Sequence, residues 1–284
     1  MRKPAFASGW FPAFTDLMPG LSRVLSKLGF CSRSAGAALA RAGRVQVDGI
    51  VRRDPEFPVQ LERQVITVDG ELVTTAPPVY LMMNKARGLV TTASDEKGRP
   101  TVFTCLEGAP KAHLSPVGRL DQASEGLLLF TNDTAWANGI TDPARHLDKT
   151  YHVQIDRQPD PALMAAFESG IRTEDGPLSA KHARLLREGE KNAWLEIVLD
   201  EGRNRHIRRL CEGLGIEVLR LIRVSIGPVK LGDLAKGAWR NLSGSEIQSL
   251  SVKPSRLERP ARQKRWRAPP RQTPPDRKSP RDTR

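Results

Sequence analysis

The chain has 284 residues, 39% of them hydrophobic, which is enough for one large domain or two modest ones with a buried core. No apolar run approaches the ~18 residues of a membrane span, and the start of the chain holds no continuous apolar stretch, so neither a membrane span nor a signal peptide is expected. The three cysteines and five histidines are scattered, which predicts no disulfide framework and no metal site and favours the cytoplasm.

The net charge of +13 indicates a polyanionic partner such as nucleic acid, but the charge is unevenly distributed. Residues 251–284 hold 12 Lys/Arg and 3 Asp/Glu, so they carry +9 and leave only +4 for the other 250 residues. The overall charge therefore describes mainly the C-terminal end. It does not by itself predict that the folded part binds nucleic acid.

Composition divides the chain into four segments. Residues 1–20 are expected to be an irregular lead-in, 21–75 a compact unit and 79–251 the main domain. Thr-Thr-Ala-Pro-Pro at 74–78 predicts a linker, because paired prolines interrupt both helix and strand. Residues 252–284 contain seven prolines, a basic cluster and almost no large aliphatic residues, so this tail is expected to be disordered.

The compact unit is predicted to begin with two helices and to continue with short strands. Apolar residues at helical spacing favour a helix over 21–28, which Gly29 ends. Ser32 is a favourable N-cap for a second helix. Asp-Gly pairs at 48–49 and 69–70 lie beside alternating Val and Ile residues, which is a strong signal of β-hairpins.

Positive side chains accompany these helices and the turn after them: Arg23, Lys27, Arg33, Arg41 and Arg44. From charge alone, an ordinary solvated face explains them as well as RNA binding does. The stretch Gly-Arg-Val-Gln-Val-Asp-Gly at 43–49, however, resembles the alpha-L RNA-binding module, and the resemblance covers residues 21–68. It implies a helix pair that lies against RNA phosphates, with these five cations in contact with RNA.

The main domain shows strand-like and helix-like runs that do not alternate regularly. Strands are predicted at 79–83, 127–130, 150–155, 180–186, 194–199 and 218–226, and helices at 161–169, 204–214 and 245–250. Without β-α-β alternation the fold class is α+β rather than a doubly wound sheet. A Gly-x-Gly-x-x-Gly after a strand and a P-loop are both missing from the sequence, so binding of dinucleotides, nucleoside triphosphates or S-adenosylmethionine has no support.

The most informative stretch is Val-Gly-Arg-Leu-Asp-Gln-Ala-Ser-Glu-Gly-Leu-Leu-Leu-Phe at 117–130, a glycine-flanked loop that leads into an apolar strand. Arg119 and Asp121 lie at the start of this loop, and loops on rigid scaffolds often carry active sites. From the residue types alone, a local Arg–Asp ion pair with a turn at Asp121 explains the pattern more simply.

Gly-Arg-Leu-Asp at 118–121, continuing to Gly-Leu-Leu at 126–128, resembles the central motif of pseudouridine synthases, in the version of the RsuA/RluB-type branch that modifies ribosomal RNA. The resemblance covers nearly all of residues 21–250. It implies an α+β catalytic domain whose mixed, largely antiparallel sheet is flanked by helices, after the small α+β RNA-binding module. It also implies that Asp121 is the catalytic aspartate and that Arg119 helps to hold RNA around the extruded base.

Two further elements agree with this resemblance. Met-Asn-Lys-Ala-Arg-Gly at 83–88 is similar to the family's Lys-Pro-x-Gly element, with Ala86 in place of the usual proline, and implies that Lys85 contacts the substrate. Asp-Glu-Lys-Gly-Arg-Pro-Thr-Val at 95–102 is also similar to this branch.

The remaining elements supply the other implied site residues. Lys-Thr-Tyr at 149–151 matches the element whose tyrosine, here Tyr151, lies against the target base. Glu-Gly-Arg-Asn-Arg-His-Ile-Arg-Arg at 201–209 resembles a third motif, in which an arginine, here Arg208, pairs with the catalytic aspartate. His206 stands where Gln or Glu is more usual, so its role is open. The other residues implied to contact RNA or the base are Arg203, Arg205 and Leu221.

The implied reaction breaks the N-glycosidic bond, rotates the uracil and joins its carbon 5 to the ribose. It is an isomerisation, so no redox cofactor, metal or co-substrate is expected. A uracil in a stem must be flipped out, and stacking on Tyr151 would contribute ~1–3 kcal/mol. Arg208 would keep Asp121 ionised, which is required whether Asp121 attacks the sugar, attacks the base or removes a sugar proton. Without the resemblance, Tyr151 is an ordinary strand aromatic and Arg208 a surface cation.

Other hypotheses remain open on the residues alone. A non-catalytic RNA-binding or ribosome-assembly factor would keep the same fold, and an RNA methyltransferase would need the cofactor loop that the sequence lacks. A glycosidase would need a second carboxylate, for which Glu125 and Asp133 are available. A thiol nucleophile would pair Cys211 with His206, although a spacing of five residues does not favour one helix face.

The expected partner is ribosomal RNA, either free or in a pre-ribosomal particle, and the protein is expected to be a monomer. The motifs at 94–102 and 202–205 are closer to those of large-subunit enzymes. The target uridine is not encoded in any pattern that the sequence displays.

Overall fold

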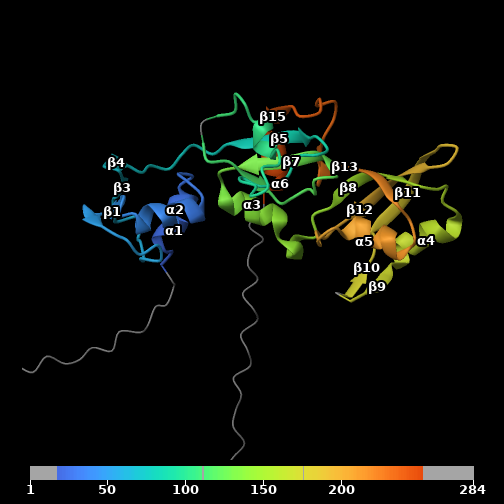
Figure 1. Ribbon diagram of the computed structural model, residues 1–284, viewed down its shortest axis with the longest axis horizontal. Helices are drawn as coiled ribbons and strands as arrows, with labels where there is room; N and C mark the ends of the chain where they lie inside the picture. The colour runs from blue at the N-terminus through green and yellow to red at the C-terminus, as the bar shows by residue number, and fades with distance from the viewer. Residues whose placement is uncertain (1–17, 111, 175, 252–284) are drawn as a thin grey trace, which may run out of the picture. The chain divides into compact units, whose positions relative to one another are not determined.

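The computed structural model describes residues 18–110, 112–174 and 176–251 (Figure 1). The expected basic tail lies outside these residues, and so does the expected lead-in apart from its last three positions. None of the helices in the described part is long and apolar enough to cross a membrane.

Two short helices open the N-terminal unit, as the sequence predicts. α1 spans Leu21–Lys27 and α2 spans Arg33–Arg41. Ser32 caps α2, because its side chain accepts a hydrogen bond from the amide of Ala35 at 3.0 Å. Gly29 adopts a φ of +72°, which lets the chain turn out of α1.

Four short strands follow as two hairpins. Their bounds are Val45–Val47 for β1, Ile50–Val51 for β2, Ile66–Val68 for β3 and Glu71–Leu72 for β4. They form an antiparallel sheet in the order β2-β1-β3-β4. Both Asp-Gly pairs have positive φ at each residue, which is the two-residue turn that the sequence predicts. Apolar residues of the two helices, β1 and β3 form a core of their own.

In the described part of the chain, the main domain is built on a nine-stranded sheet. The strands are β5 Tyr80–Lys85, β6 Ser115–Val117, β7 Glu125–Thr131, β8 Lys149–Ile155, β11 His182–Glu188, β12 Ala193–Leu199, β13 Val218–Ile226, β14 Val229–Lys230 and β15 Trp239–Asn241. Their order is β11-β12-β8-β13-β7-β5-β15, with β14 beside β13 and β6 beside β7 (Figure 1). Only the β13–β7 pair is parallel among these described strands, so the mixed, largely antiparallel sheet is confirmed.

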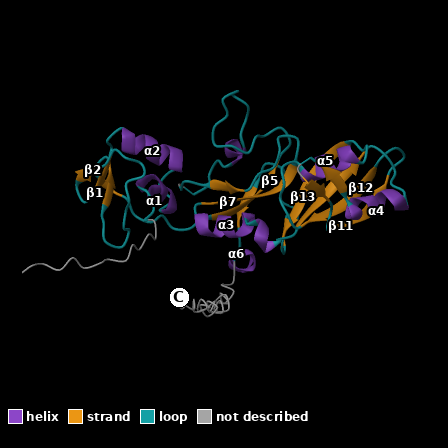
Figure 2. Ribbon diagram, turned by 90° about the horizontal axis from the view of Figure 1, so that it is seen from below, coloured by secondary structure: helices purple, strands orange, loops and turns teal. Residues whose placement is uncertain are grey.

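Helices cover both faces of this sheet. They are α3 Thr134–Thr141, α4 Pro161–Ser169, α5 His206–Gly213 and α6 Gly244–Leu250, with 3-10 turns at Val102–Cys105 and Pro143–Arg145. α3 and α6 lie on one side of β5 and β7 (Figure 2), where their apolar residues pack on alternate residues of those strands. α4 and α5 contribute to the core on the opposite face, together with β8, β12 and β13. A small hairpin of β9 Ile171–Thr173 and β10 Gly176–Leu178 adjoins α5.

The predicted strand runs are all present, and α4 has the predicted bounds. α3 was not predicted, because Asn138 and Gly139 weaken its apolar pattern. Asp133 begins this helix by accepting hydrogen bonds from the amides of Ala135 and Trp136, each at 3.0 Å. Asp133, which the sequence left available as a glycosidase's second carboxylate, is therefore a helix cap.

The parallel β13–β7 pair determines where the loop that carries Asp121 lies. Gly126 of β7 is opposite Arg223 of β13 and has a φ of +102°. A Cβ atom on Gly126 would lie 2.3 Å from the carbonyl oxygen of Arg223, so a residue larger than glycine does not fit. This close approach holds the loop that precedes β7 against the centre of the sheet.

Candidate active site

A cavity of about 380 Å³ lies where β8 and β13 meet the loops that precede β7 and α5. Six of the residues predicted for the site line it: Arg119, Asp121, Tyr151, Arg203, Arg205 and Leu221. These residues come from four separate stretches of the chain. The fold therefore brings residues of different sequence motifs together at one cavity.

Lys85 holds the loop that carries Asp121. Its side chain is fully buried, and its ammonium donates hydrogen bonds to the carbonyls of Ser124 at 2.7 Å, Asp121 at 3.0 Å and Ala86 at 3.1 Å. Burial lowers the pKa of Lys85 to about 8, although Asp121 and Glu125 raise it. The expectation that Lys85 contacts the substrate is therefore wrong, because a fully buried ammonium bonded to carbonyls does not reach RNA.

Further bonds join the same loop to the element at 83–88. The amide of Gly88 donates to the carbonyl of Gln122 at 2.8 Å, and the Gln122 side chain donates back to the Gly88 carbonyl at 3.1 Å. The hydroxyl of Thr91 donates to the carbonyl of Leu120 at 2.7 Å. The loop around Asp121 is thus held by one backbone bond and two side-chain bonds, with Ala86 in the place of the family's proline.

Tyr151 and Leu221 supply the apolar walls of the cavity. Tyr151, on β8, is 8% exposed, and Leu221, on β13, is 6% exposed. The two strands are antiparallel neighbours, with Tyr151 opposite Arg223 and Leu221 opposite Val153. An aromatic ring and a leucine therefore border the same space as the Asp121 loop.

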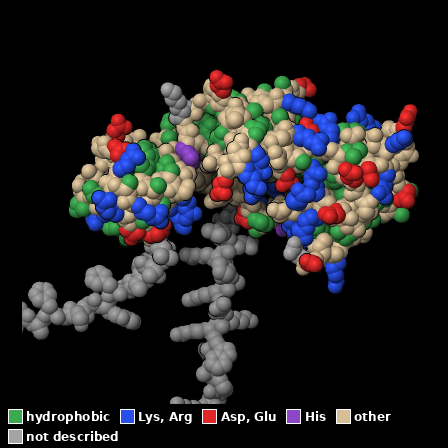
Figure 3. Space-filling model, viewed as in Figure 1, with side chains coloured by type: hydrophobic (Ala, Val, Ile, Leu, Met, Phe, Trp, Pro, Cys, Tyr) green, Lys and Arg blue, Asp and Glu red, His purple; other side chains and the backbone are tan. Residues whose placement is uncertain are grey.

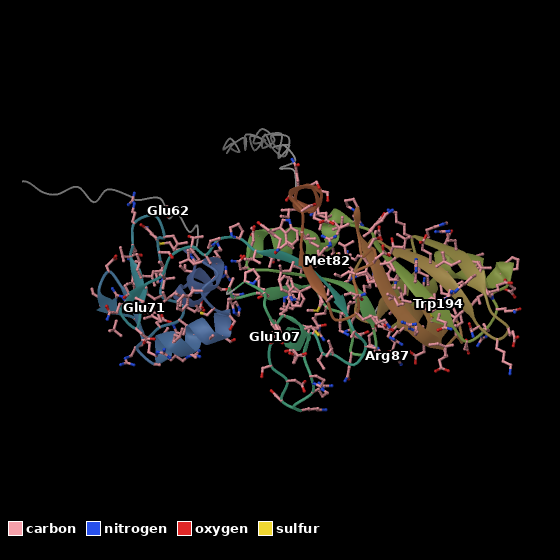
Figure 4. The ribbon with its side chains drawn as sticks, turned by 90° about the horizontal axis from the view of Figure 1, so that it is seen from above. Glu62, Glu71, Met82, Arg87, Glu107 and Trp194 are labelled. Carbon is pink, nitrogen blue, oxygen red and sulfur yellow. The ribbon has the colours of Figure 1, made fainter. Side chains whose placement is uncertain are left out.

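Arg208 supports the Asp121 loop from α5 without pairing directly with the carboxylate. Its guanidinium donates to the carbonyls of Ala123 at 3.3 Å and Val218 at 3.4 Å. Burial lowers the pKa of Arg208, as do the cations Arg205 and Arg87, whereas Asp121 raises it. Of these residues, Arg87 is labelled in Figure 4. Within the described residues there is no Asp121–Arg208 ion pair, so the direct pairing implied by the resemblance is replaced by a bond to the loop's backbone and a longer-range attraction.

His206 lines the cavity and holds the loop at 200–205 in place. It is 3% exposed, and its Nε2 donates to the carbonyl of Ser179 at 3.1 Å, while its Nδ1 lies 3.4 Å from the Glu201 carboxylate. Burial lowers the pKa of His206. Arg205, directly before it, adopts a left-handed φ of +49°, so this short loop presents Arg205 to the cavity.

Two cations that line the cavity, Lys149 and Arg223, were not predicted as site residues. Arg223 is 5% exposed; its Nε donates to the carbonyl of Leu127 at 2.8 Å, and its Nη2 has no hydrogen-bond partner among the described residues. Lys149 donates to the carbonyl of Leu147 at 2.8 Å. Lys149 begins the Lys-Thr-Tyr element, and this adjacency was the one sequence signal that could have identified it.

The five predicted RNA-contact cations of the N-terminal unit are all exposed: Arg23, Lys27, Arg33, Arg41 and Arg44. Lys and Arg side chains are visible over the region of α1 and α2 in Figure 3. Arg44 also forms a two-point ion pair with Asp69, with one contact of 2.9 Å from Nε to Oδ1. Its charge is therefore partly neutralised, unlike that of an unpaired lysine or arginine.

The alternatives that rested on other side chains lose support. Glu125 does not line the cavity and is held by Arg220 at 2.9 Å and Lys236 at 2.9 Å, so it is not placed as a glycosidase's second carboxylate. Burial raises the pKa of Cys211 to about 12, which keeps its thiol protonated and poorly nucleophilic. The described residues contain no group of three or more His, Cys, Asp or Glu side chains that could hold a metal ion.

Comparison with known proteins gives consistent matches along the chain. Residues 79–213 match the RNA pseudouridylate synthase family model, and residues 20–65 match the S4 domain. The chain is 36% identical to an uncharacterized RNA pseudouridine synthase of Aquifex aeolicus, with 81% of this chain and 92% of the relative covered. It is 35% identical to ribosomal large subunit pseudouridine synthase B of Bacillus subtilis, with 82% and 96% covered. A crystal structure of a pseudouridylate synthase is 31% identical, with a TM-score of 0.58 and 82% of this chain and all of that chain covered.

Proposed function

Because this chain belongs to the RNA pseudouridine synthase family, we propose that it converts a specific uridine of ribosomal RNA to pseudouridine with Asp121 as its catalytic carboxylate. The observation that carries the proposal is the cavity that Asp121 shares with Tyr151 and Leu221. These residue types suit an extruded uracil, which needs an aromatic or apolar surface on its faces and a carboxylate near its ribose.

The substrate is proposed to be large-subunit ribosomal RNA. Its support is the identity to a relative named for the large subunit over 82% of this chain. The S4 domain match and the exposed cations of α1 and α2 supply a second RNA contact that is governed by phosphates. The enzyme is proposed to act in the cytoplasm as a monomer, on free RNA or on a pre-ribosomal particle.

Binding begins with the extrusion of the target nucleotide into the cavity. Tyr151 packs against the uracil and contributes ~1–3 kcal/mol, which offsets part of the cost of unstacking. Leu221 closes the opposite side. The exposed arginines at the cavity rim, Arg119, Arg203 and Arg205, bind the flanking phosphates.

The chemistry is a rearrangement within one nucleotide. The bond between ribose C1′ and uracil N1 breaks, the uracil turns, a bond forms between C1′ and C5, and the proton on C5 is lost while N1 gains one. Asp121 acts in its ionised form, either by attack on the nucleotide or by removal of a sugar proton. Since the product has the same atoms as the substrate, the reaction consumes no co-substrate.

Arg208 and Lys85 act on Asp121 through the loop. Lys85 fixes the carbonyls of Asp121 and Ser124, and Arg208 fixes the carbonyl of Ala123. Both residues are therefore proposed as positioning residues, and Asp121 as the group that reacts.

The experiment that tests this proposal is pseudouridine mapping of total ribosomal RNA by carbodiimide labelling. Cells that lack the gene are complemented with the wild-type chain, with Asp121→Asn, or with Asp233→Asn as a matched control on an exposed loop outside the cavity. We expect one pseudouridine to disappear on deletion, to return with the wild type and Asp233→Asn, and to stay absent with Asp121→Asn.

A map that does not change on deletion would contradict the ribosomal RNA assignment, and transfer RNA would be mapped next. If the deletion phenotype were instead restored fully by Asp121→Asn, the chain would act as a non-catalytic RNA-binding factor.

A further inference from the structure

Two cations face the cavity from neighbouring strands. Lys149 on β8 shares a strand face with Tyr151, two residues along, and Arg223 on β13 is the cross-strand partner of Tyr151. Both residues line the cavity. Burial lowers the pKa of Lys149, and the positive charge of Arg223 lowers it further.

Neither cation has an acidic partner within the described part of the chain. The acids whose charge acts on Lys149 are Asp148 and Asp200, and these are paired with Lys181 at 2.7 Å and His146 at 3.1 Å. Arg223 donates to one carbonyl and keeps its buried Nη2 unpaired. Placing two cations side by side in a partly dry cavity is costly when no carboxylate of the described residues is bonded to either, so the arrangement favours a negatively charged occupant.

We propose that Lys149 and Arg223 form a subsite for the uracil anion that exists while the base is detached from its ribose. This proposal rests on the proposed function. When the C1′–N1 bond breaks, its electron pair stays on the uracil, and the negative charge is shared by N1, O2 and O4. The charge is absent from the bound uridine, so the two cations stabilise the detached base more than the substrate, and the barrier to cleavage falls.

The same subsite retains the base while it turns. An ammonium and a guanidinium attract the anion mainly through charge, so the attraction survives a change in which edge of the ring faces them. C5 then attacks C1′, the C5 proton is lost, N1 takes a proton, and the product is neutral. Loss of the charge weakens the attraction and assists release of the product.

An RNA phosphate is a less suitable occupant of this subsite. Lys149 and Arg223 lie with Tyr151 and Leu221, which suit a base, and Arg223 is only 5% exposed. Phosphates are better served by the exposed Arg119, Arg203 and Arg205.

The test compares two leaving bases in the full-length enzyme. A transcript of the stem that mapping identifies is made with uridine or with 5-fluorouridine at the target position, and cleavage of the N-glycosidic bond is followed in single turnovers. Fluorine withdraws electrons and stabilises the uracil anion without help from the protein. We expect Lys149→Met to slow the uridine reaction about 100-fold and the 5-fluorouridine reaction about tenfold, with little change in KM.

The controls separate charge from folding. Lys149→Arg should restore most of the rate, and Lys191→Met, which removes an exposed lysine outside the cavity, should react like the wild type. An unchanged rate for Lys149→Met, or an equal slowing of both substrates, would overturn the proposal in favour of a structural role.

A second measurement uses only the wild-type enzyme and does not depend on how a variant folds. 5-Nitrouracil, which is anionic at neutral pH, should inhibit more strongly than neutral uracil, and equal inhibition would count against the subsite. A wild-type enzyme that forms no pseudouridine in any RNA would refute the proposed function instead, whatever the inhibitors do.

Discussion

Replacement of Lys85 by methionine is expected to lower activity much more than stability. The ammonium of Lys85 is fully buried and bonds to the carbonyls of Ala86, Asp121 and Ser124. Methionine fills a similar volume but donates no hydrogen bond, so the loop that carries Asp121 loses its main attachment to β5.

The expected loss of stability follows from two opposing contributions. Leaving the carbonyls of the half-buried Ala86 and Asp121 unpaired costs about 1 kcal/mol each, and leaving that of the buried Ser124 unpaired costs about 2–3 kcal/mol. Against this, burial lowers the pKa of Lys85 from 10.5 to about 8, so removal of the ammonium recovers about 3 kcal/mol. The net loss is about 1–2 kcal/mol, which lowers the unfolding temperature by roughly 2–8 °C.

The expected loss of activity is larger, because a displacement of Asp121 by about 1 Å reduces the rate about 100-fold. Single-turnover pseudouridine formation measures the rate, and urea denaturation measures the free energy of unfolding. Lys230→Met, at the exposed position of β14, is the matched control. Full activity in Lys85→Met, or a loss of stability above about 5 kcal/mol, would refute the reasoning.

The same substitution has a pH signature. Between pH 8 and 10.5 the unfolded chain binds the Lys85 proton more tightly than the folded chain does. The free energy of unfolding of the wild type should therefore rise with pH across this window relative to that of Lys85→Met, by about 3 kcal/mol in total. Below pH 8 the difference between the two proteins should be constant.

Three further substitutions test the supports of the site. Glu125→Gln should lower the free energy of unfolding by about 2 kcal/mol in urea denaturation, because the 4%-exposed carboxylate holds Arg220 through two hydrogen bonds. His206→Gln should lose less stability than the wild type when the pH falls from 7.5 to 5. Burial lowers the pKa of His206 below its ordinary 6.5, so acid favours the unfolded state of the wild type. Urea denaturation at the two pH values measures the difference. Gly126→Ala should give little soluble protein, because its Cβ would meet the carbonyl oxygen of Arg223 at 2.3 Å; a normal yield and circular dichroism spectrum would show that the strands can separate.

Local patterns were sufficient for much of the fold. Ser32 caps α2, and the Asp-Gly pairs at 48–49 and 69–70 turn both hairpins, because caps and tight turns depend on a few neighbouring residues. The long strands β8, β12 and β13 were also predicted, since their apolar runs do not depend on which strand lies next to them. α3 was missed, because its start depends on the carboxylate of Asp133 more than on an apolar period.

The motifs named Asp121, Tyr151 and Leu221, and the fold brings these three residues to one cavity. They did not give the roles of the side chains around it. Lys85 was expected to face the substrate and is instead bonded to carbonyls 36 and 39 residues away. Arg208 was expected to pair with Asp121 and instead holds the carbonyl of Ala123.

The sequence by itself determined most elements of the two folded parts and the family, and it proposed Asp121 as the catalytic carboxylate. Only the tertiary structure decided which charges are buried and what they touch. The parallel pairing of β7 with β13 places Gly126 against Arg223 and leaves Arg223 and Lys149 facing the cavity without acidic partners in the described residues. Contacts between segments far apart in the chain decide which charged side chains are buried and which are paired. A pattern of neighbouring residues does not predict those contacts.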